Sequence, residues 1–133
     1  MKKQLTIETE NRFQLIDITN QVENFVVQNK VKSGICLVFV PHSTAAIILT
    51  ENEDGLKSDW LKILGKLIEG ESFEHDRIDD NADSHLLSGL LGQGKVLPIE
   101  EGLLVRGRWQ QIFLVELDGP RTRKVTIKII KDL

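Results

Sequence analysis

Alternating apolar and polar residues predict strands at both ends of the chain. Near the N-terminus the alternation covers residues 4–8 and 12–15, which is typical of half-buried strands. These two segments meet near residues 10–11, so we expect them to pair as an opening hairpin. Near the C-terminus Val125, Ile127 and Ile129 alternate with polar residues, and this spacing predicts a strand over residues 124–130.

Two continuous apolar runs, residues 35–40 and 45–49, predict central strands. The first run contains no polar side chain except the thiol of Cys36, which is typical of a strand buried on both faces. Pro41 ends it, and His42, Ser43 and Thr44 connect it to the second run. Further strands are predicted over residues 96–99, 103–105 and 109–117.

Three segments have the apolar spacing of amphipathic helices. Thr19 is predicted as the N-cap of the first, which we expect to end by about Lys32. The acidic residues 51–54 open the second, Gly70 ends it, and Gly92 ends a short third helix. The apolar stripes are Val22, Phe25 and Val26 in the first helix, Leu56, Trp60, Ile63, Leu64 and Leu67 in the second, and Leu86, Leu87, Leu90 and Leu91 in the third.

The order of these elements predicts the fold class. Strands and helices do not alternate regularly, which argues against a doubly wound parallel sheet. We predict an α+β fold with a mixed, largely antiparallel sheet and helices packed against it. The chain of 133 residues has the length of a single domain, residues 1–133, and is long enough to bury a core of its own.

Charge and composition exclude several functional classes. The net charge is −3 and no basic face stands out, so we expect no nucleic-acid partner. No run approaches the roughly 20 apolar residues of a membrane span, so we expect no membrane association and no signal segment. Cys36 is the only cysteine and cannot form an internal disulfide, which favours a cytoplasmic location.

The stretch from Asp79 to His85 concentrates ionisable chemistry directly before an apolar helix. A helix start explains its acidic residues and Asn81, because they can accept bonds from free N–H groups and suit the positive end of the helix dipole. It does not explain His85. The other two histidines are His42 and His75, so one pocket could join all three as ligands of a divalent metal, zinc or magnesium. Alternatively, one imidazole aligned by Asp80 could act as a general acid or base, or the histidines could be plain surface or capping residues.

Four arginines form two pairs with alternating spacing, Arg106 with Arg108 and Arg121 with Arg123. In an extended chain both members of a pair can point the same way and clamp a phosphate through their forked donors. The alternative is that they are ordinary exposed strand arginines.

Four ordered motifs carry a resemblance to a known family. They are His42-Ser43-Thr44-Ala45-Ala46, Asp80-Asn81-Ala82-Asp83-Ser84-His85-Leu86, Gly107-Arg108-Trp109-Gln110 and Asp118-Gly119-Pro120-Arg121. With these motifs the chain resembles the YjbQ family, small proteins often labelled secondary thiamine-phosphate synthases. One position departs from the family pattern, because Arg108 stands where the family usually has threonine.

The resemblance implies a sheet curled into an incomplete sandwich, a homotrimer, and a cluster of histidines and acids near a subunit boundary, matching His42, His75, Asp80 and His85. It also implies an enzyme acting on a small phosphorylated metabolite, with thiamine-phosphate synthase-like transfer as the named activity. We predict catalytic roles for His42, Asp80 and His85 and metal contacts for His42, His75 and His85. The predicted substrate contacts are Ser43, Thr44, Asn81, Trp109, Gln110, Arg121 and Arg123. The alternative hypothesis is a non-catalytic homotrimer that binds a metal or a metabolite.

Overall fold

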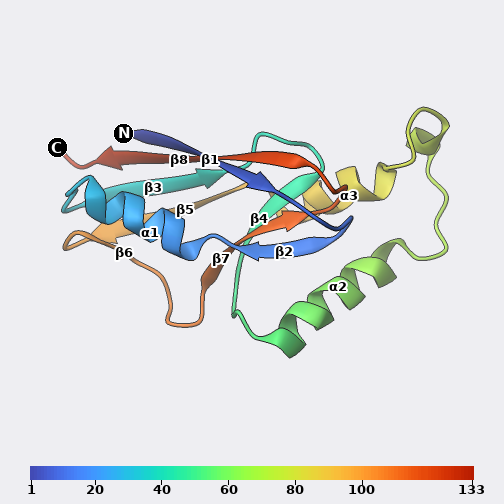
Figure 1. The fold of residues 1–133 in the computed structure, drawn as a ribbon, viewed down its shortest axis with the longest axis horizontal. Helices are drawn as coiled ribbons and strands as arrows, with labels where there is room; N and C mark the ends of the chain where they lie inside the picture. Colours follow the sequence, from blue (N-terminus) through green and yellow to red (C-terminus); the bar gives the residue numbers. More distant parts are fainter.

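Two antiparallel sheets and three α-helices form the molecule, whose computed structural model describes residues 1–133 (Figure 1). The strands are β1 (Lys2–Glu8), β2 (Gln14–Asp17), β3 (Gly34–Phe39), β4 (Ala45–Thr50), β5 (Gly94–Glu100), β6 (Leu103–Leu104), β7 (Gln111–Glu116) and β8 (Thr122–Lys131). The helices are α1 (Thr19–Gln28), α2 (Asp54–Ile68) and α3 (Ala82–Leu91), with a 3₁₀ turn η1 (Glu74–Arg77) before α3. Both termini lie at the end of the molecule opposite α3.

The strand order confirms the predicted fold class. One sheet has the order β1-β8-β3-β5-β6 and the other β2-β7-β4, and every ladder is antiparallel. The two sheets pack face to face as an incomplete sandwich, an α+β arrangement in which α1 packs against the core between the sheets and α2 and α3 cover the outer face of the three-stranded sheet.

The predicted opening hairpin is wrong, although both of its strands exist. β1 pairs with β8, placing Leu5 opposite Val125, whereas β2 pairs with β7 in the other sheet and places Leu15 opposite Val115. Alternation along a strand reports which residues face the core, but the same pattern suits any partner strand. The first two strands therefore separate and become edges of different sheets.

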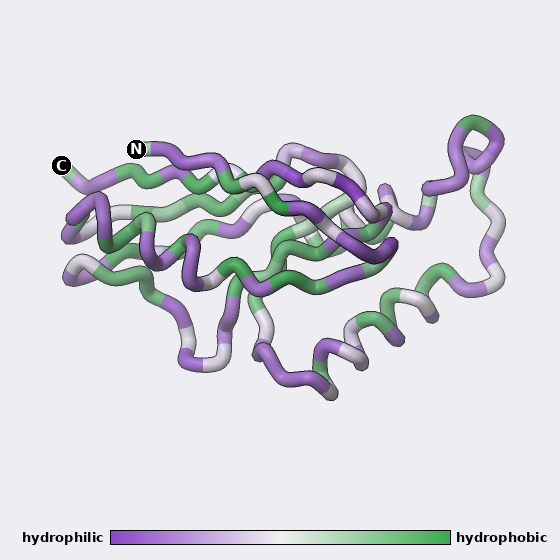
Figure 2. Tube along the Cα trace, in the orientation of Figure 1, coloured by the Kyte–Doolittle hydropathy of each residue, from purple (hydrophilic) through white to green (hydrophobic).

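The core is divided by the three-stranded sheet into two layers. The larger cluster lies between the sheets and includes Val22 and Val26 of α1 together with Val38, Ile47 and Ile127. The smaller cluster lies on the other face of the sheet, where α2 and α3 contribute buried leucines to β4 and β7. Figure 2 shows hydrophobic residues along the central strands, while the β6–β7 loop and the segment before α2 are hydrophilic.

One face of β3 is open, which corrects the prediction of a strand buried on both faces. Cys36 and Val38 are fully buried, but Ile35 is 42% exposed and Phe39 39% exposed on the opposite side. No helix of this chain covers the outer face of the five-stranded sheet (Figure 1). The apolar run alone could not reveal this difference between the two faces.

The helices match their predicted positions, with differences at the ends and in burial. Thr19 is the first residue of α1 rather than its N-cap, and the helix ends at Gln28. Of the apolar stripe of α2 only Leu64 is buried, while Ile63 and Leu67 are more than half exposed. The helix α3 ends at Gly92 as predicted, with a positive φ there. None of the helices has the length and apolar character needed to cross a bilayer.

Candidate functional site

The turn between β7 and β8 brings three of the four sequence motifs together. Glu116 ends β7 and lies opposite Ala45, so the segment from His42 to Thr44 before β4 lies beside the turn. Asn81, directly before α3, reaches the same turn through Asp118. The antiparallel register thus gathers polar residues at one end of the three-stranded sheet, where the chain leaves the hydrogen-bonded ladder.

A fully buried ion pair supports this end of the sheet. Arg123 is 2% exposed and Glu116 0%, and Arg123 donates to both carboxylate oxygens of Glu116. Glu116 also accepts from Thr9 Oγ1 at 2.7 Å and from two backbone N–H groups at 3.0 Å. Arg123 Nη2, which donates to Glu116 Oε2, also donates to the carbonyl and hydroxyl oxygens of Thr44. Both charges are therefore satisfied by several partners, as burial of an ion pair requires.

The pKa of Glu116 reflects this arrangement. Burial raises it, but hydrogen bonds from Arg123, from the Asp118 N–H and from Thr9 outweigh burial, so that the pKa lies below its ordinary value of 4.5. The carboxylate is ionised at neutral pH, and the pair has no net charge.

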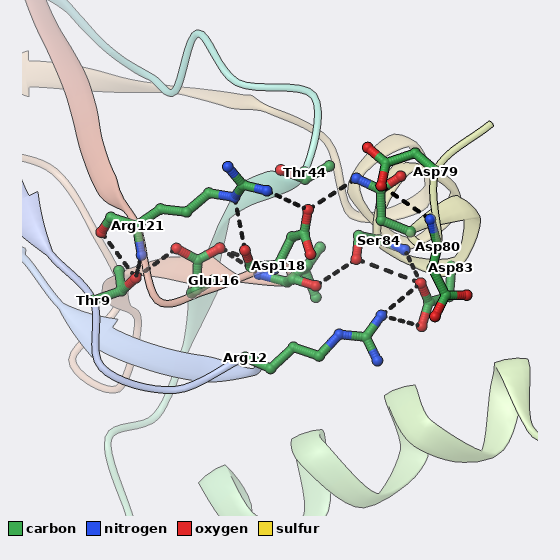
Figure 3. A network of polar contacts seen from close by, with 12 residues as sticks. Thr9, Arg12, Thr44, Asp79, Asp80, Asp83, Ser84, Glu116, Asp118 and Arg121 are labelled. Atoms are coloured by element: carbon green, nitrogen blue, oxygen red, sulfur yellow. Dashed lines mark hydrogen bonds and ion pairs between the residues drawn. The ribbon is translucent and has the colours of Figure 1, made fainter. Parts of the chain in front are cut away.

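Asp118 connects the turn to α3. Figure 3 shows it between the Arg121 side chain and the start of α3. Arg121 donates from Nε to the Asp118 carbonyl oxygen at 2.7 Å and from Nη2 to Asp118 Oδ2 at 3.0 Å, and Asn81 Nδ2 donates to the same Oδ2 at 2.9 Å. Burial raises the pKa of Asp118, but the donors Asn81 and Arg121 outweigh it and keep the pKa below its usual value.

Gly119 permits the turn to approach the N-terminal segment. A Cβ at this position would overlap the carbonyl oxygen of Asn11 and crowd the Glu116 side chain and Thr9 Oγ1. Only glycine therefore fits between Asp118 and the cis peptide bond to Pro120.

A polar pocket of about 500 Å³ opens beside the turn. It has no hydrophobic lining residue, and its walls are His42, Ser43, Thr44, Pro120, Arg121, Thr122 and Arg123. Arg121 and Asp118 differ in exposure, because the Arg121 side chain is 52% exposed while that of Asp118 is only 15% exposed. The pocket therefore presents cationic and hydroxyl groups, and the carboxylates lie behind them.

The hydrogen bond of His42 fixes its tautomer. The backbone N–H of Lys124 donates to His42 Nε2 at 3.1 Å, so Nε2 is the lone-pair nitrogen and Nδ1 carries the proton. Burial lowers the pKa of His42, and Arg123 and Arg121 lower it further against the opposing effect of Glu116. His42 is thus a neutral ring with an N–H donor in the wall of the pocket.

His75 and His85 form a separate pair. Their ring centroids are 4.9 Å apart in an edge-to-face arrangement, and His75 Nε2 lies 2.9 Å from Asn81 Oδ1. His85 faces an apolar groove of about 540 Å³ between α2 and α3, which includes Leu67, Phe73 and Leu90. Neither ring of the pair lines the pocket that contains His42.

Within one chain the structure differs from several sequence predictions for this site. His42 lines a different pocket from the one that His85 lines, and no group of three or more His, Cys, Asp or Glu side chains in the chain is placed to hold a metal ion. Asp80 is exposed and contacts no imidazole; its neighbour Asn81 does. Both arginines of this pair donate through Nε and Nη2 only, but the Arg123 side chain is 3% exposed and tied to Glu116 and Thr44, whereas that of Arg121 is 52% exposed, so Arg121 is the arginine open to a ligand.

The fourth motif lies elsewhere in the chain. Trp109 lines a different polar pocket of about 290 Å³ with Asp17, Thr19 and Arg106, and the Arg108 guanidinium stacks 4.9 Å from the centre of its ring. The Gln110 side chain accepts from the Gly107 N–H and closes its own loop. Within one chain these two residues do not meet the predicted substrate contacts near His42.

Sequence reasoning missed Glu116, Asp118 and Thr9. The signal for Glu116 was a single carboxylate inside the apolar run 109–117, which can be buried there only with a partner. Asp118 was named only as part of the last motif and was given no role in the site. Thr9 had no recognisable signal, since its contact with Glu116 spans 107 positions of the sequence.

The fold and this site define a class of small α+β proteins with a polar pocket at the end of a two-sheet sandwich. The chain belongs to the UPF0047 family, since a family model described as "UPF0047 protein YjbQ-like" matches residues 3–132. A UPF0047 protein of Archaeoglobus fulgidus is 45% identical over 128 residues, covering 96% of this chain and 99% of the relative. The UPF0047 protein YugU of Bacillus subtilis is 37% identical, covering 98% and 99%.

Solved structures agree with this membership. A YbjQ-like protein of unknown function from Sulfolobus solfataricus is 48% identical with a TM-score of 0.97, covering 99% of this chain and 97% of that one. A hypothetical protein from Aeropyrum pernix is 34% identical with a TM-score of 0.95, covering 99% of both chains. The sandwich is therefore shared across these relatives.

Proposed function

We propose that the protein is a cytoplasmic enzyme that acts on a small phosphorylated metabolite and holds the phosphate in the pocket beside the β7–β8 turn. The observation that carries this proposal is the set of unused donors in that pocket. Arg121 Nη1, the Ser43 hydroxyl and His42 Nδ1–H have no hydrogen-bond partner within the chain. A guanidinium with neighbouring neutral donors suits a phosphate oxygen set.

The chemistry would divide between two groups of residues. Arg121 neutralises the charge of a phosphate or diphosphate in the pocket, while the pair of His75 and His85, which lies outside the pocket lining and is joined to Arg121 through Asn81 and Asp118, supplies the proton that the departing diphosphate takes up. Thiamine-phosphate formation is the named candidate reaction. In it the thiazole nitrogen forms a bond to the pyrimidine methylene carbon, the bond from that carbon to oxygen breaks, and the electron pair leaves with diphosphate.

Phosphate affinity tests the pocket. Arg121→Gln should weaken binding of inorganic diphosphate about 10- to 100-fold in a calorimetric titration, because a charged hydrogen bond contributes about 1.5–3 kcal/mol. Arg108→Gln is the matched control, since it removes an exposed arginine outside the pocket and should leave binding unchanged. Equal affinity of wild type and Arg121→Gln for diphosphate would contradict the proposal that this pocket holds the phosphate.

Turnover tests the histidine pair. The expected result is product from a pyrimidine methyl diphosphate and a thiazole phosphate with wild type, and none with His85→Ala, while the variant keeps its circular dichroism spectrum. Undiminished turnover by His85→Ala would contradict the role of this residue.

A second proposal is a non-catalytic homotrimer that binds a metal or the metabolite. Its support is the 4.9 Å pair of imidazoles, which supplies two nitrogen ligands and would need a third from a neighbouring copy. Nitrogen ligands fit zinc better than magnesium, which prefers oxygen. Light scattering should then give a mass three times the 15.1 kDa of the chain, and elemental analysis should find zinc that is lost in His75→Ala. A monomer without metal would contradict it.

A further inference from the structure

Asn81 lies at the N-cap position of α3 but does not cap the helix. Its side chain makes no capping hydrogen bond, and the N–H of Ala82 instead donates to Asp76 Oδ1 at 3.2 Å. Asn81 is 6% exposed, so its polar side chain is buried at the helix start and used elsewhere. This use needs an explanation other than helix stability.

Both ends of the Asn81 amide are engaged, each by a different neighbour. Oδ1 lies 2.9 Å from His75 Nε2, and Nδ2 donates to Asp118 Oδ2 at 2.9 Å. An amide oxygen can only accept, so His75 Nε2 must carry a proton. The neutral form of His75 is therefore the Nε2–H tautomer, with its lone pair on Nδ1.

Asp118 determines which way the amide points. An ionised carboxylate only accepts hydrogen bonds, so it selects the NH₂ end of Asn81 and turns the oxygen toward His75. Arg121 Nη2 donates to the same carboxylate oxygen, Oδ2, and Arg121 Nε donates to the backbone carbonyl oxygen of Asp118. The hydrogen bonds from Asn81 and Arg121 outweigh the effect of burial on the pKa of Asp118 and keep it ionised.

We propose that Asn81 is a positioning residue that transmits the orientation set by Asp118 to His75, so that His75 presents a basic Nδ1 beside His85. Its importance for turnover rests on the function proposed above, in which the histidine pair transfers protons. This role replaces the predicted substrate contact of Asn81, because both of its polar ends are bound within the chain.

The mechanism that follows connects the pocket to the histidine pair. Arg121, which faces the phosphate, also holds Asp118, and Asp118 sets the amide that fixes His75. A second neighbour that fixes the tautomer of a functional imidazole is a common device in enzymes and metal sites. Here the neighbour that fixes the tautomer is the uncharged amide of Asn81, which places no charge next to His75.

Imidazole NMR tests the proposal directly. With ¹⁵N-labelled protein at about pH 8.5, well above the ordinary histidine pKa of about 6.5, long-range ¹H–¹⁵N spectra distinguish the two neutral tautomers. Wild-type His75 should show the Nε2–H pattern alone, whereas His42 should show Nδ1–H and serves as an internal reference. Each signal is assigned by His→Gln variants.

Two substitutions then remove the hydrogen bonds that fix the tautomer of His75, each in a different way. Asn81→Ala deletes the amide and should give His75 a mixture of tautomers. Asp118→Asn keeps the shape but admits the reversed amide, so that Nδ1–H appears in part. The His42 pattern should stay unchanged in both variants, which controls for a general loss of structure.

Three results would overturn the proposal. They are a mixture at His75 in wild type, Nδ1–H at His75 in wild type, and the wild-type pattern persisting in both folded variants. The wild-type spectrum tests the predicted tautomer of His75 even if one variant fails to fold. The measurement uses no ligand, so its failure is separate from failure of phosphate binding or turnover.

Discussion

Replacing Arg123 by Met should be among the most destabilising single changes in this protein. It removes a guanidinium that is 2% exposed and leaves Glu116, which is 0% exposed, without its counter-ion. Removal of one partner of a buried ion pair costs about 3–5 kcal/mol. For 133 residues the unfolding entropy is roughly 0.28 kcal/mol/K, so the melting temperature should fall by roughly 10–18 °C.

A double-mutant cycle measures the pairing itself. Urea unfolding of Arg123→Met, Glu116→Gln and the double variant gives three free energies, and the double variant should lose about 1–3 kcal/mol less than the sum of the singles. Arg12→Met is the matched control, because its ion pair with Asp83 is exposed on the arginine side and should contribute about 0–1 kcal/mol.

The effect of pH on this pair has a defined sign. The folded state binds the Glu116 proton less readily than the unfolded chain, whose pKa is about 4.5, so the stabilisation is complete above pH 4.5 and is lost as the pH falls through the lower folded pKa. The difference between wild type and Arg123→Met should therefore be largest above pH 4.5 and narrow below it. A loss of less than about 1 kcal/mol at pH 7, or strictly additive effects, would refute this account of the pair.

Three further changes have expected outcomes. Gly119→Ala should lower the free energy of unfolding by more than about 1 kcal/mol, because the new methyl group meets the Asn11 carbonyl oxygen. Gly65→Ala, at a helical position with open space around it, should raise the free energy of unfolding by about 0.5–1 kcal/mol, and thermal melts of both variants check these values. Burial raises the pKa of Cys36 to about 11, so a thiol reagent at pH 8 should label it only after denaturation, and fast native labelling would contradict its burial. Leu87→Ala should cost about 2–5 kcal/mol in urea unfolding, because the side chain is 1% exposed, and a cost near zero would show that the smaller core layer contributes little.

The sequence predicted the elements better than their partners. Helical spacing around Val22 and Val26 is a local property, and α1 is present almost where it was expected. Pairing of Leu5 with Val125 is not local, since alternation is equally compatible with any strand of the right face. The apolar spacing of α2 likewise indicates which side of the helix is apolar but not how much of that side another element covers. A full buried stripe was expected, and only Leu64 is buried.

The site was predicted in its residue types and only partly in its geometry. The motif around Asp118 and the segment from His42 to Thr44 do meet, because antiparallel pairing of β4 with β7 joins them. The expectation that Asp80 aligns an imidazole was displaced by one residue, because Asp80 is exposed while Asn81, at the N-cap position, is buried with its Oδ1 2.9 Å from His75 Nε2. Both residues precede the helix, and the sequence alone does not indicate which of two adjacent loop side chains turns inward.

The buried pair and the pocket depend on each other through one short turn. Glu116 fixes the Leu117 and Asp118 N–H groups, and Asp118 in turn holds Arg121 at the pocket. Loss of the Glu116 carboxylate should therefore make the position of Arg121 less fixed, although the two side chains share no hydrogen bond. Glu116→Gln is expected to weaken diphosphate binding in the calorimetric assay even where the protein stays folded. Leu87→Ala, which is also destabilising but changes a buried side chain of α3 that does not line the pocket, should leave the affinity of the folded protein unchanged. Equal affinity of Glu116→Gln and wild type would mean that the turn keeps its geometry without the buried carboxylate, and that its interior charge serves stability alone.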